Sequence, residues 1–273
     1  MIYKQEGRTI EGIICSELKG DARYCYAENY LRAKGHTFQK PDTSPKSPDF
    51  VIFPFKNEPD KSIYDEHFFA ALGRNTLIFS GLRSPYLTQK CRKYNLEYHV
   101  MMEDGGVAIK NAVPTSEGVI LYLISNRTNT IANSRILVIG YGTCGRDLAK
   151  RLKALDADVY ALVRSREKEC AADSDSVKPI YIDALNAPTD PNFDVIINTV
   201  PQQVLTNEHL SKAKGTLLID IASKPYGFDI EYAKQLNEKS ALLPGIPGKY
   251  AIQTAGEVLG EYVDYILGRG KQK

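Results

Sequence analysis

The sequence predicts an α/β protein with two domains, each built on a parallel sheet. Two observations lead to this fold class. Short apolar runs alternate with amphipathic segments of helical length along the chain, which is typical of parallel βαβ units. The run 135–139 is then followed by Gly140-x-Gly142-x-x-Gly145 and a helical segment, the context in which these glycines mark a dinucleotide-binding turn. The expected architecture is an N-terminal α/β parallel-sheet domain and a C-terminal Rossmann doubly wound domain.

The expected domain boundaries follow from the order of these segments. Residues 1–112 read as a complete α/β domain that lacks a dinucleotide motif. Residues 113–249 read as the Rossmann domain with a leading helix that bridges into it. The last segment, 250–273, carries apolar positions at helical spacing, and we expect this helix to pack back on the first domain.

In the first domain, apolar runs bounded by turn residues predict the strands, and the segments between them predict the helices. Strands are expected at 10–16, 36–38, 49–55, 76–80 and 97–101. One helix is expected to end at Ala33, and two more to span 64–73 and 85–95. Residues 40–48 are rich in Pro and Ser and predict a surface loop.

In the second domain, a helix is expected to open at Val113-Pro114, because Pro is favoured in a first turn, and to end near Thr128. Six apolar runs fit the strands of a doubly wound sheet. These strands are expected at 135–139, 158–163, 179–182, 193–199, 216–222 and 241–243. Helices are expected between them at 147–155, 206–213 and 229–239.

The bulk composition is that of an ordinary globular protein. Of 273 residues, 43% are hydrophobic and 25% charged, and the formal net charge is +2. This charge gives no electrostatic reason to expect nucleic acid or an anionic membrane as a partner. Five scattered cysteines without a CxxC pair predict reduced thiols in a cytoplasmic protein, with no disulfide framework and no metal site. No apolar run approaches the ~20 residues that span a bilayer, and no signal peptide is evident.

Each glycine of the motif has a physical role. Gly140 permits the tight turn off the strand, Gly142 lets a pyrophosphate approach the backbone, and Gly145 lets the helix pack close to the strand. The helix N-terminus then offers free N–H groups and a partial positive charge to the phosphates. Cys144 is interpreted as a small space-filling residue and not as a nucleophile. The expected cofactor contacts in this loop are Gly140, Tyr141, Gly142, Thr143, Cys144 and Gly145.

The end of the second Rossmann strand predicts the type of dinucleotide. An NAD-binding domain places a carboxylate here, about 20 residues past the glycines, to hold the ribose 2′-OH. This chain has Arg164, Ser165 and Arg166, with no carboxylate before Glu167. Guanidinium groups match the geometry of a 2′-phosphate, so the cofactor is expected to be NADP. The alternative is that both arginines are solvated loop charges.

Polar residues and glycines gather in the loops after the last three strands, where ligands of an open α/β sheet bind. Cofactor contacts are expected at Asn198, Thr199, Val200 and Pro201, and catalytic roles at Ser223 and Lys224. Substrate contacts are expected at Gly245, Pro247, Gly248 and Lys249, and at Thr115 and Ser116 of the bridging helix.

Two arginines of the first domain are further candidates. Arg23 and Arg83 follow strands and are expected to face the substrate, where either could clamp a carboxylate bidentately. The alternative is that they are surface arginines in ordinary turns. None of the four histidines lies in a loop expected to reach the site, so a His–carboxylate proton relay is not supported.

The chain resembles the A-subunit family of dipicolinate synthase over nearly its whole length. The resemblance is carried by GDAR at 20–23, SGLRSPYL at 80–87, NAVPTSEG at 111–118, the glycine motif, VRS at 163–165, INTVP at 197–201, IDIASKPYG at 219–227 and LLPGIPGKYAIQTAG at 242–256. Two positions beside the expected substrate depart from the family pattern. Tyr226 stands where the family commonly has glycine, and Lys249 where it usually has an apolar residue.

The resemblance implies an NADP-linked oxidation of dihydrodipicolinate to dipicolinate, pyridine-2,6-dicarboxylate, the calcium-chelating acid of bacterial spores. It also implies a role in sporulation and a partner, the flavoprotein-like B-subunit of dipicolinate synthase, and a homo-oligomer is expected. Aromatisation is strongly downhill, so the enzyme mainly aligns two rings and neutralises two carboxylates. The cations assigned to that task are Arg23, Arg83, Lys224 and Lys249.

Two other classes of function are compatible with the sequence. One is another NAD(P)-dependent dehydrogenase of the hydroxy-acid or shikimate type. A hydroxy-acid dehydrogenase needs a histidine acid/base near the nicotinamide, and a shikimate-type enzyme would use a Lys–Asp pair in the first domain; neither is evident here. The other class is a non-catalytic NADP-binding protein.

Overall fold

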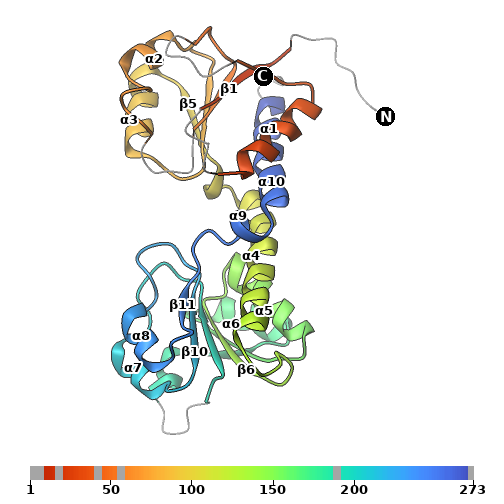
Figure 1. Cartoon of the computed structure of the whole chain (residues 1–273), viewed down its shortest axis with the longest axis vertical. Helices are drawn as coiled ribbons and strands as arrows, with labels where there is room; N and C mark the ends of the chain where they lie inside the picture. Colours follow the sequence, from red (N-terminus) through yellow and green to blue (C-terminus); the bar gives the residue numbers. More distant parts are fainter. Residues whose placement is uncertain (1–8, 16–20, 40–44, 54–58, 187–191, 270–273) are drawn as a thin grey trace. The chain divides into compact units, whose positions relative to one another are not determined.

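The computed structural model divides the chain into two compact units (Figure 1). Unit 1 comprises Met1–Ala108 and Ile252–Lys273, and unit 2 comprises Ile109–Ala251. The structure describes residues 9–15, 21–39, 45–53, 59–186 and 192–269. Gly20 of the GDAR motif lies outside these residues, and so do parts of the predicted strands 10–16 and 49–55 and of the predicted loop 40–48. Each unit has one sheet with parallel pairings throughout, which confirms the predicted fold class.

Unit 1 has a five-stranded sheet in the order β2-β1-β3-β4-β5. Its strands are β1 (Glu11–Ile14), β2 (Thr37–Gln39), β3 (Phe50–Ile52), β4 (Leu77–Ser80) and β5 (Glu97–Val100). Its helices are α1 (Arg23–Ala33), α2 (Glu66–Ala71), α3 (Pro85–Tyr94), the 3₁₀ turn η2 (Met101–Glu103) and α10 (Ile252–Arg269). Helices α2 and α3 contribute to the core on one face of the sheet, and α1 and α10 to the core on the other.

Helix α10 is integral to unit 1, as predicted for the last helix. It lies alongside α1 (Figure 1), and two glycines at the contact allow the backbones to approach. A Cβ at Gly256 would lie 2.2 Å from the carbonyl oxygen of Arg23, and one at Gly260 would lie 2.9 Å from that of Ala27. Leu259 and Val263 of α10 are buried in the same hydrophobic cluster as Leu31.

Glu66, the first residue of α2, links that helix to α3. Its carboxylate accepts hydrogen bonds from Lys90, from Lys93 at 2.8 Å and from the Tyr94 hydroxyl. The hydrogen bond from Lys90 is the largest of the causes that lower the pKa of Glu66 from 4.5 to about 2.

We expect this depressed pKa to make the stability of unit 1 sensitive to acid. A carboxyl whose folded pKa lies below its unfolded value stabilises the fold above the unfolded pKa, and the effect is lost as the pH falls through the folded pKa. Stability measured by urea unfolding should therefore fall between pH 4.5 and about 2, and Glu66→Gln should flatten this dependence. An equally steep dependence in Glu66→Gln would contradict this assignment.

Unit 2 has a six-stranded sheet in the order β11-β10-β9-β6-β7-β8, the doubly wound order predicted. Its strands are β6 (Arg135–Ile139), β7 (Asp158–Leu162), β8 (Lys178–Ile180), β9 (Val195–Asn198), β10 (Leu217–Asp220) and β11 (Ala241–Leu242). Helix α4 spans Gly105–Asn126, and its part from Ile109 onward belongs to unit 2. The other helices of the unit are α5 (Thr143–Ala154), α6 (Arg166–Ser174), the 3₁₀ turn η3 (Ile182–Asn186), α7 (Asn207–Lys212), α8 (Ile230–Leu236) and α9 (Pro247–Tyr250).

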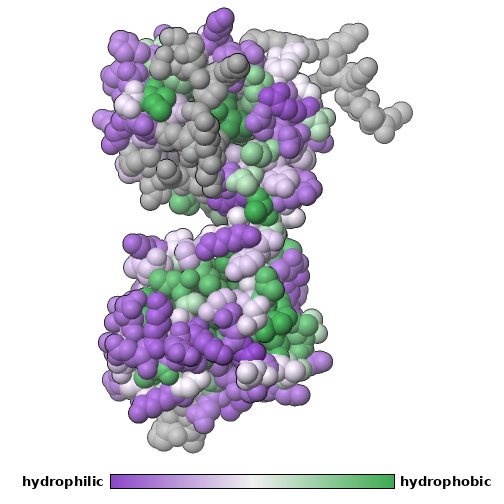
Figure 2. All heavy atoms as spheres, in the orientation of Figure 1, coloured by the Kyte–Doolittle hydropathy of each residue, from purple (hydrophilic) through white to green (hydrophobic). Residues whose placement is uncertain are grey.

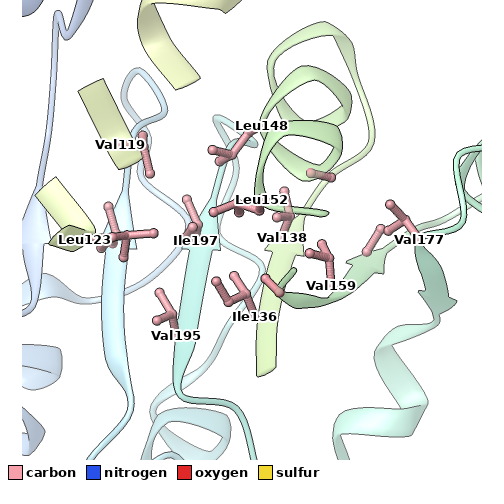
Figure 3. Close-up of a cluster of buried hydrophobic side chains, with 14 of the residues drawn as sticks. Val119, Leu123, Ile136, Val138, Leu148, Leu152, Val159, Val177, Val195 and Ile197 are labelled. Carbon is pink, nitrogen blue, oxygen red and sulfur yellow. The ribbon is translucent and has the colours of Figure 1, made fainter. Parts of the chain in front are cut away.

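The core on one face of this sheet includes residues of α4, α5, α6 and the strands. Figure 3 shows Val119 and Leu123 of α4 and Leu148 and Leu152 of α5 directed toward the strand residues, among them Ile197. These side chains are almost fully buried. The second face is covered by a separate cluster that includes residues of α7 and α8.

Helix α4 differs from its prediction, because it begins at Gly105 and not at Val113. The Asp104 carboxylate caps its first turn by accepting hydrogen bonds from the backbone N–H groups of Gly106 (2.8 Å) and Val107 (3.0 Å). Pro114 consequently lies inside the helix. Helix α4 also has the length and mean hydropathy (1.2) of a membrane span, a test that core helices of globular proteins pass as well.

Candidate functional site

The glycine turn after β6 has the geometry that its three glycines predict. Gly140 has φ +90°, and a Cβ there would lie 2.5 Å from Cγ2 of Val200. A Cβ at Gly145 would lie 2.1 Å from the carbonyl oxygen of Gly140. Around Gly142, in contrast, no protein atom lies within 4 Å of a built Cβ. Two glycines are therefore required by packing, and the third leaves open space above the turn.

The N-terminus of α5 faces this open space without a side-chain cap. Gly142 is the N-cap residue, no side chain of the described chain caps it, and the first turn has no acidic residue. The first N–H groups and the positive end of the helix dipole are thus left for an anion, as a pyrophosphate requires. Burial raises the pKa of the Cys144 thiol, which disfavours the reactive thiolate. The interpretation of Cys144 as a space-filling residue stays a prediction.

Tyr141 contributes to this loop through its backbone, because its ring is buried in the core of unit 2. Its hydroxyl donates a hydrogen bond to Oδ2 of Asp175 (3.0 Å), the residue that follows α6. Arg146 of α5 donates to the same carboxylate from Nε (2.6 Å) and Nη2 (3.1 Å). Asp175 therefore ties α6 to the glycine turn, a role that no sequence pattern indicated.

The corner after β7 is basic. Ser165 is the N-cap of α6, and its hydroxyl accepts the N–H of Lys168 at 3.4 Å. Arg164 and Arg166 are exposed, and neither has a hydrogen bond or ion pair within the described ranges. The nearest carboxylate along the chain, Glu167, is exposed and contacts Lys168 at 3.2 Å. The corner thus presents two unneutralised guanidinium groups beside a helix N-terminus.

The loop after β9 is held by Asn198, whose side chain is fully buried. Asn198 donates hydrogen bonds to Oδ2 of Asp220 (3.0 Å) and to the carbonyl oxygen of Val200 (2.9 Å), so its side chain fixes the conformation of the loop. Thr199 donates to the carbonyl oxygen of Ile139 at 2.8 Å and so ties the loop to the end of β6. Val200 is partly exposed and Pro201 exposed, next to the glycine turn.

Asp220, the last residue of β10, organises the loop that carries Ser223 and Lys224. It is 1% exposed, and its carboxylate accepts hydrogen bonds from the backbone N–H groups of Ala222 (2.8 Å) and Gly227 (2.7 Å) as well as from Asn198. Burial raises its pKa. A carboxylate at the end of the apolar run TLLIDIA is the signal that could have identified this residue from the sequence.

We expect Asp220→Ala to destabilise unit 2 by about 3 kcal/mol or more, because it leaves two buried backbone N–H groups without their acceptor at about 1–3 kcal/mol each. Asp220→Asn keeps one acceptor oxygen, so its free energy of unfolding should fall by less. Urea unfolding of the two variants measures the difference. If Asp220→Ala were as stable as the wild type, the carboxylate would not hold this loop.

The predicted residues of the next loops fall into two groups. Ser223 and Lys224 are exposed, and the Lys224–Pro225 peptide bond is cis. Lys249 is exposed on α9, which packs on α4 where Gly118 leaves room for Ile246. The two lysines make no ion pair with any described residue.

The remaining residues predicted to contact substrate range from exposed to fully buried. Gly245 is exposed with φ +67°, Gly248 is partly exposed, and Pro247 is buried. Thr115 donates to the carbonyl oxygen of Asn111 at 2.7 Å within α4. Ser116 is fully buried, and its hydroxyl has no hydrogen-bond partner in the described chain.

The two arginines predicted from unit 1 are both ion-paired within that unit. Arg23 donates from Nε (2.8 Å) and Nη2 (2.5 Å) to the Asp21 carboxylate. Arg83 donates from Nε to Glu103 at 2.8 Å and from Nη2 to its other oxygen, and these hydrogen bonds raise the pKa of Arg83. A substrate carboxylate would have to replace Asp21 or Glu103 at these guanidinium groups.

Comparison with known proteins agrees with this geometry. Residues 122–222 match the family model "D-isomer specific 2-hydroxyacid dehydrogenase, NAD binding domain". The A-subunit of dipicolinate synthase from Bacillus subtilis (strain 168) is 33% identical over 192 residues, which are 70% of this chain and 64% of that protein. The predicted resemblance to the A-subunit family of dipicolinate synthase is confirmed. The alignment with this curated relative spans just under two thirds of the relative's length.

Solved structures of the dipicolinate synthase A-subunit share the fold over nearly the whole chain. The one from Bacillus subtilis is 25% identical, with 96% of both chains covered and a TM-score of 0.85. The one from Bacillus halodurans is 26% identical, with 94% of this chain and 97% of that chain covered and a TM-score of 0.83. D-lactate dehydrogenase from Escherichia coli, 12% identical with a TM-score of 0.64, shares the fold alone. Unit 2 is thus a nicotinamide-dinucleotide-binding domain of the oxidoreductase type.

Proposed function

We propose that this protein is an NADP-dependent oxidoreductase that oxidises dihydrodipicolinate to dipicolinate. The observation that carries the cofactor choice is the corner after β7, where Arg164 and Arg166 have no carboxylate partner among the described residues. A ribose 2′-phosphate would supply the missing negative charge. The substrate choice rests on the relationship to the A-subunit of dipicolinate synthase.

The cofactor would lie along the carboxyl edge of the unit 2 sheet. The open face of Gly142 and the uncapped turn of α5 fit the pyrophosphate, and the loop at Thr199–Pro201 flanks the same turn. The exposed guanidinium groups and Ser165 fit the 2′-phosphate. When bound, the nicotinamide ring supplies the hydride acceptor.

The protein's own contribution to the reaction is charge and position. Oxidation removes a hydride and a proton from neighbouring ring carbons, and the gain in aromaticity makes it downhill without a strong base. Lys224 lies in the loop after β10, and Lys249 lies on α9, which follows the neighbouring strand β11. Both lysines carry unpaired charge, so we assign them to the two substrate carboxylates. Ser223 would donate a hydrogen bond beside Lys224. Arg23 and Arg83 are further candidates for binding the substrate carboxylates, but each would first have to release its present partner, Asp21 or Glu103.

The biological setting is part of the same proposal. A dipicolinate-forming enzyme would act in the cytoplasm of a spore-forming bacterium. Because the curated relative is the A-subunit of its enzyme, we propose the corresponding B-subunit as a partner, and a homo-oligomer as well.

The test is reduction of NADP in the presence of dihydrodipicolinate, followed at the reduced-nicotinamide absorbance band. We expect Lys224→Ala to raise KM for the diacid about 10- to 150-fold, the value of one charged hydrogen bond of about 1.5–3 kcal/mol. Lys234→Ala is the matched control, since Lys234 is an exposed lysine of α8 that pairs with Glu231 at 3.6 Å. An unchanged KM in Lys224→Ala would remove this lysine from the substrate site. No NADP reduction by the wild type would overturn the function.

The match to the 2-hydroxyacid dehydrogenase model favours a second candidate, oxidation of a 2-hydroxy acid. That chemistry uses a histidine acid/base. All four histidines are in the described ranges. His36 contacts Asp264 at 2.8 Å and His99 stacks on Phe79, both in unit 1. His67 lies in α2 of unit 1, and His209 lies in α7, beside residues that precede β9 and β10, so none lies at the proposed cofactor site. A panel of 2-hydroxy acids in the same assay separates the two candidates.

A further inference from the structure

Unit 2 contains a cavity of about 540 Å³ at the edge of the sheet where its strands begin. Its wall includes Phe193 and Asp194, which precede β9, and Gly215 and Thr216, which precede β10. The glycine turn and the other proposed cofactor contacts follow the strands, so they lie at the opposite edge. A cavity of this size holds an organic molecule and is much larger than a single inorganic ion needs.

The wall combines an apolar part with a cationic part. Phe193, Leu205, Leu210 and Leu217 supply buried apolar surface. The charged side chains that line the cavity in the described chain are Arg127, Lys212, Lys214, Lys239 and a single carboxylate, Asp194. Figure 2 shows a mainly hydrophilic surface over α7 and α8, the helices that flank part of this region. Cationic side chains therefore outnumber anionic ones in a wall that also contains apolar residues.

Most of this positive charge is not neutralised by the protein. Arg127, Lys214 and Lys239 have no carboxylate within 4.0 Å in the described chain, and Lys212 reaches Glu208 only at 4.0 Å. Arg127 is nevertheless held in place, because Nη2 donates to Oγ of Ser134 at 2.9 Å. Asp194 accepts the backbone N–H of Arg135 at 2.7 Å and has no ion-pair partner among these residues.

His209, which also lines the cavity, has one ring nitrogen beneath the accessible surface. Its Nδ1 accepts the backbone N–H of Thr206 at 3.1 Å, so the neutral ring carries its proton on Nε2. Nε2 is buried and has no hydrogen-bond partner in the described chain.

We propose that this cavity binds a small organic anion that carries at least two negative charges on an aromatic or other apolar body. The cations come from the end of α4, the end of α7 and the turn before β11, so they can contact anionic groups at separate points of one ligand. The inference stands apart from the proposed oxidation, because none of these cations belongs to the proposed cofactor or substrate contacts.

Calorimetric titration of the full chain, saturated with NADP, tests the proposal with four probes. Pyridine-2,6-dicarboxylate and phenyl phosphate combine charge with an aromatic ring and separate carboxylate from phosphate recognition. Pyridine-2,6-dicarboxamide has the ring without the charge, and inorganic phosphate has the charge without the ring. We expect one of the first two to bind, and the last two to bind at least tenfold more weakly.

Variants locate the binding. The double variant Lys214→Ala/Lys239→Ala should bind the aromatic anion about 10-fold or more weakly than the wild type, as expected for loss of a charged hydrogen bond. Lys234→Ala, outside the cavity, should leave it unchanged. In a second measurement, the ligand should slow acetylation of Lys214 and Lys239 but not of Lys234. Equal affinity in the double variant, or tightest binding by inorganic phosphate, would overturn the proposal.

Discussion

Gly142→Val is expected to abolish tight NADP binding while leaving the fold intact. The valine side chain would fill the open space above the turn, where no protein atom lies within 4 Å of a built Cβ. A pyrophosphate placed there makes several charge-assisted hydrogen bonds of about 1.5–3 kcal/mol each, so losing two weakens binding about 100-fold or more. Gly142 has φ −82° and ψ −166°, a region open to valine, and loss of a glycine N-cap costs about 1 kcal/mol or less.

Two further glycine variants make this result specific. Gly268→Val, in α10 and also with no protein atom within 4 Å of its built Cβ, should leave NADP binding unchanged. Gly145→Ala, unlike Gly142→Val, should destabilise the fold of unit 2, because its Cβ would overlap the carbonyl oxygen of Gly140. Fluorescence titration with NADPH and thermal unfolding of all three variants separate binding from folding. Wild-type NADPH affinity in Gly142→Val would place the cofactor elsewhere.

The second large effect is expected on the choice between NADP and NAD. Arg164→Gln/Arg166→Gln removes two guanidinium groups that lie after β7 and have no hydrogen bond or ion pair within the described ranges. If both contact the 2′-phosphate, at about 1.5–3 kcal/mol each, NADP affinity falls about 100-fold or more, and NAD, which lacks that phosphate, binds as before. The measured quantity is the ratio of the two dissociation constants.

Arg92→Gln is the matched control, because Arg92 is an exposed arginine of α3 in unit 1. It should leave the ratio unchanged. Raising the ionic strength should weaken NADP binding more than NAD binding in the wild type and equally in the double variant. A double variant that lost affinity for both dinucleotides in parallel would show that the arginines act on something other than the 2′-phosphate.

The sequence was sufficient to predict most of the fold, because its signals are local. The alternation of apolar runs and helical segments predicted both parallel sheets, and the glycine motif predicted the turn at Gly140–Gly145. The start of α4 was missed, since Pro114 resembles a first-turn proline while the actual cap is Asp104, nine residues before Val113. A single cap side chain outweighs a proline preference when the residues between them can all be helical.

The details of the site depend on contacts between distant segments, which no local pattern encodes. Asp175 meets Tyr141 across 34 positions, and Asp220 meets Asn198 across 22. Arg83 was predicted from its turn alone, yet Glu103, 20 positions later, neutralises it. Residue type indicates which side chains could act at the site. Only the tertiary structure shows which of them already make ion pairs or hydrogen bonds within the protein.

The place of α10 in the chain has a consequence for biosynthesis. The ribosome makes α1 and the strands of unit 1 before unit 2, but it makes α10, which packs with Leu31 on one face of that sheet, only after unit 2. The dinucleotide-binding unit is a continuous segment that precedes α10, so its core needs no residue of α10 or of the chain after it. Unit 1 therefore cannot complete its core until all of unit 2 has been synthesised, although most of its own residues precede unit 2 in the chain.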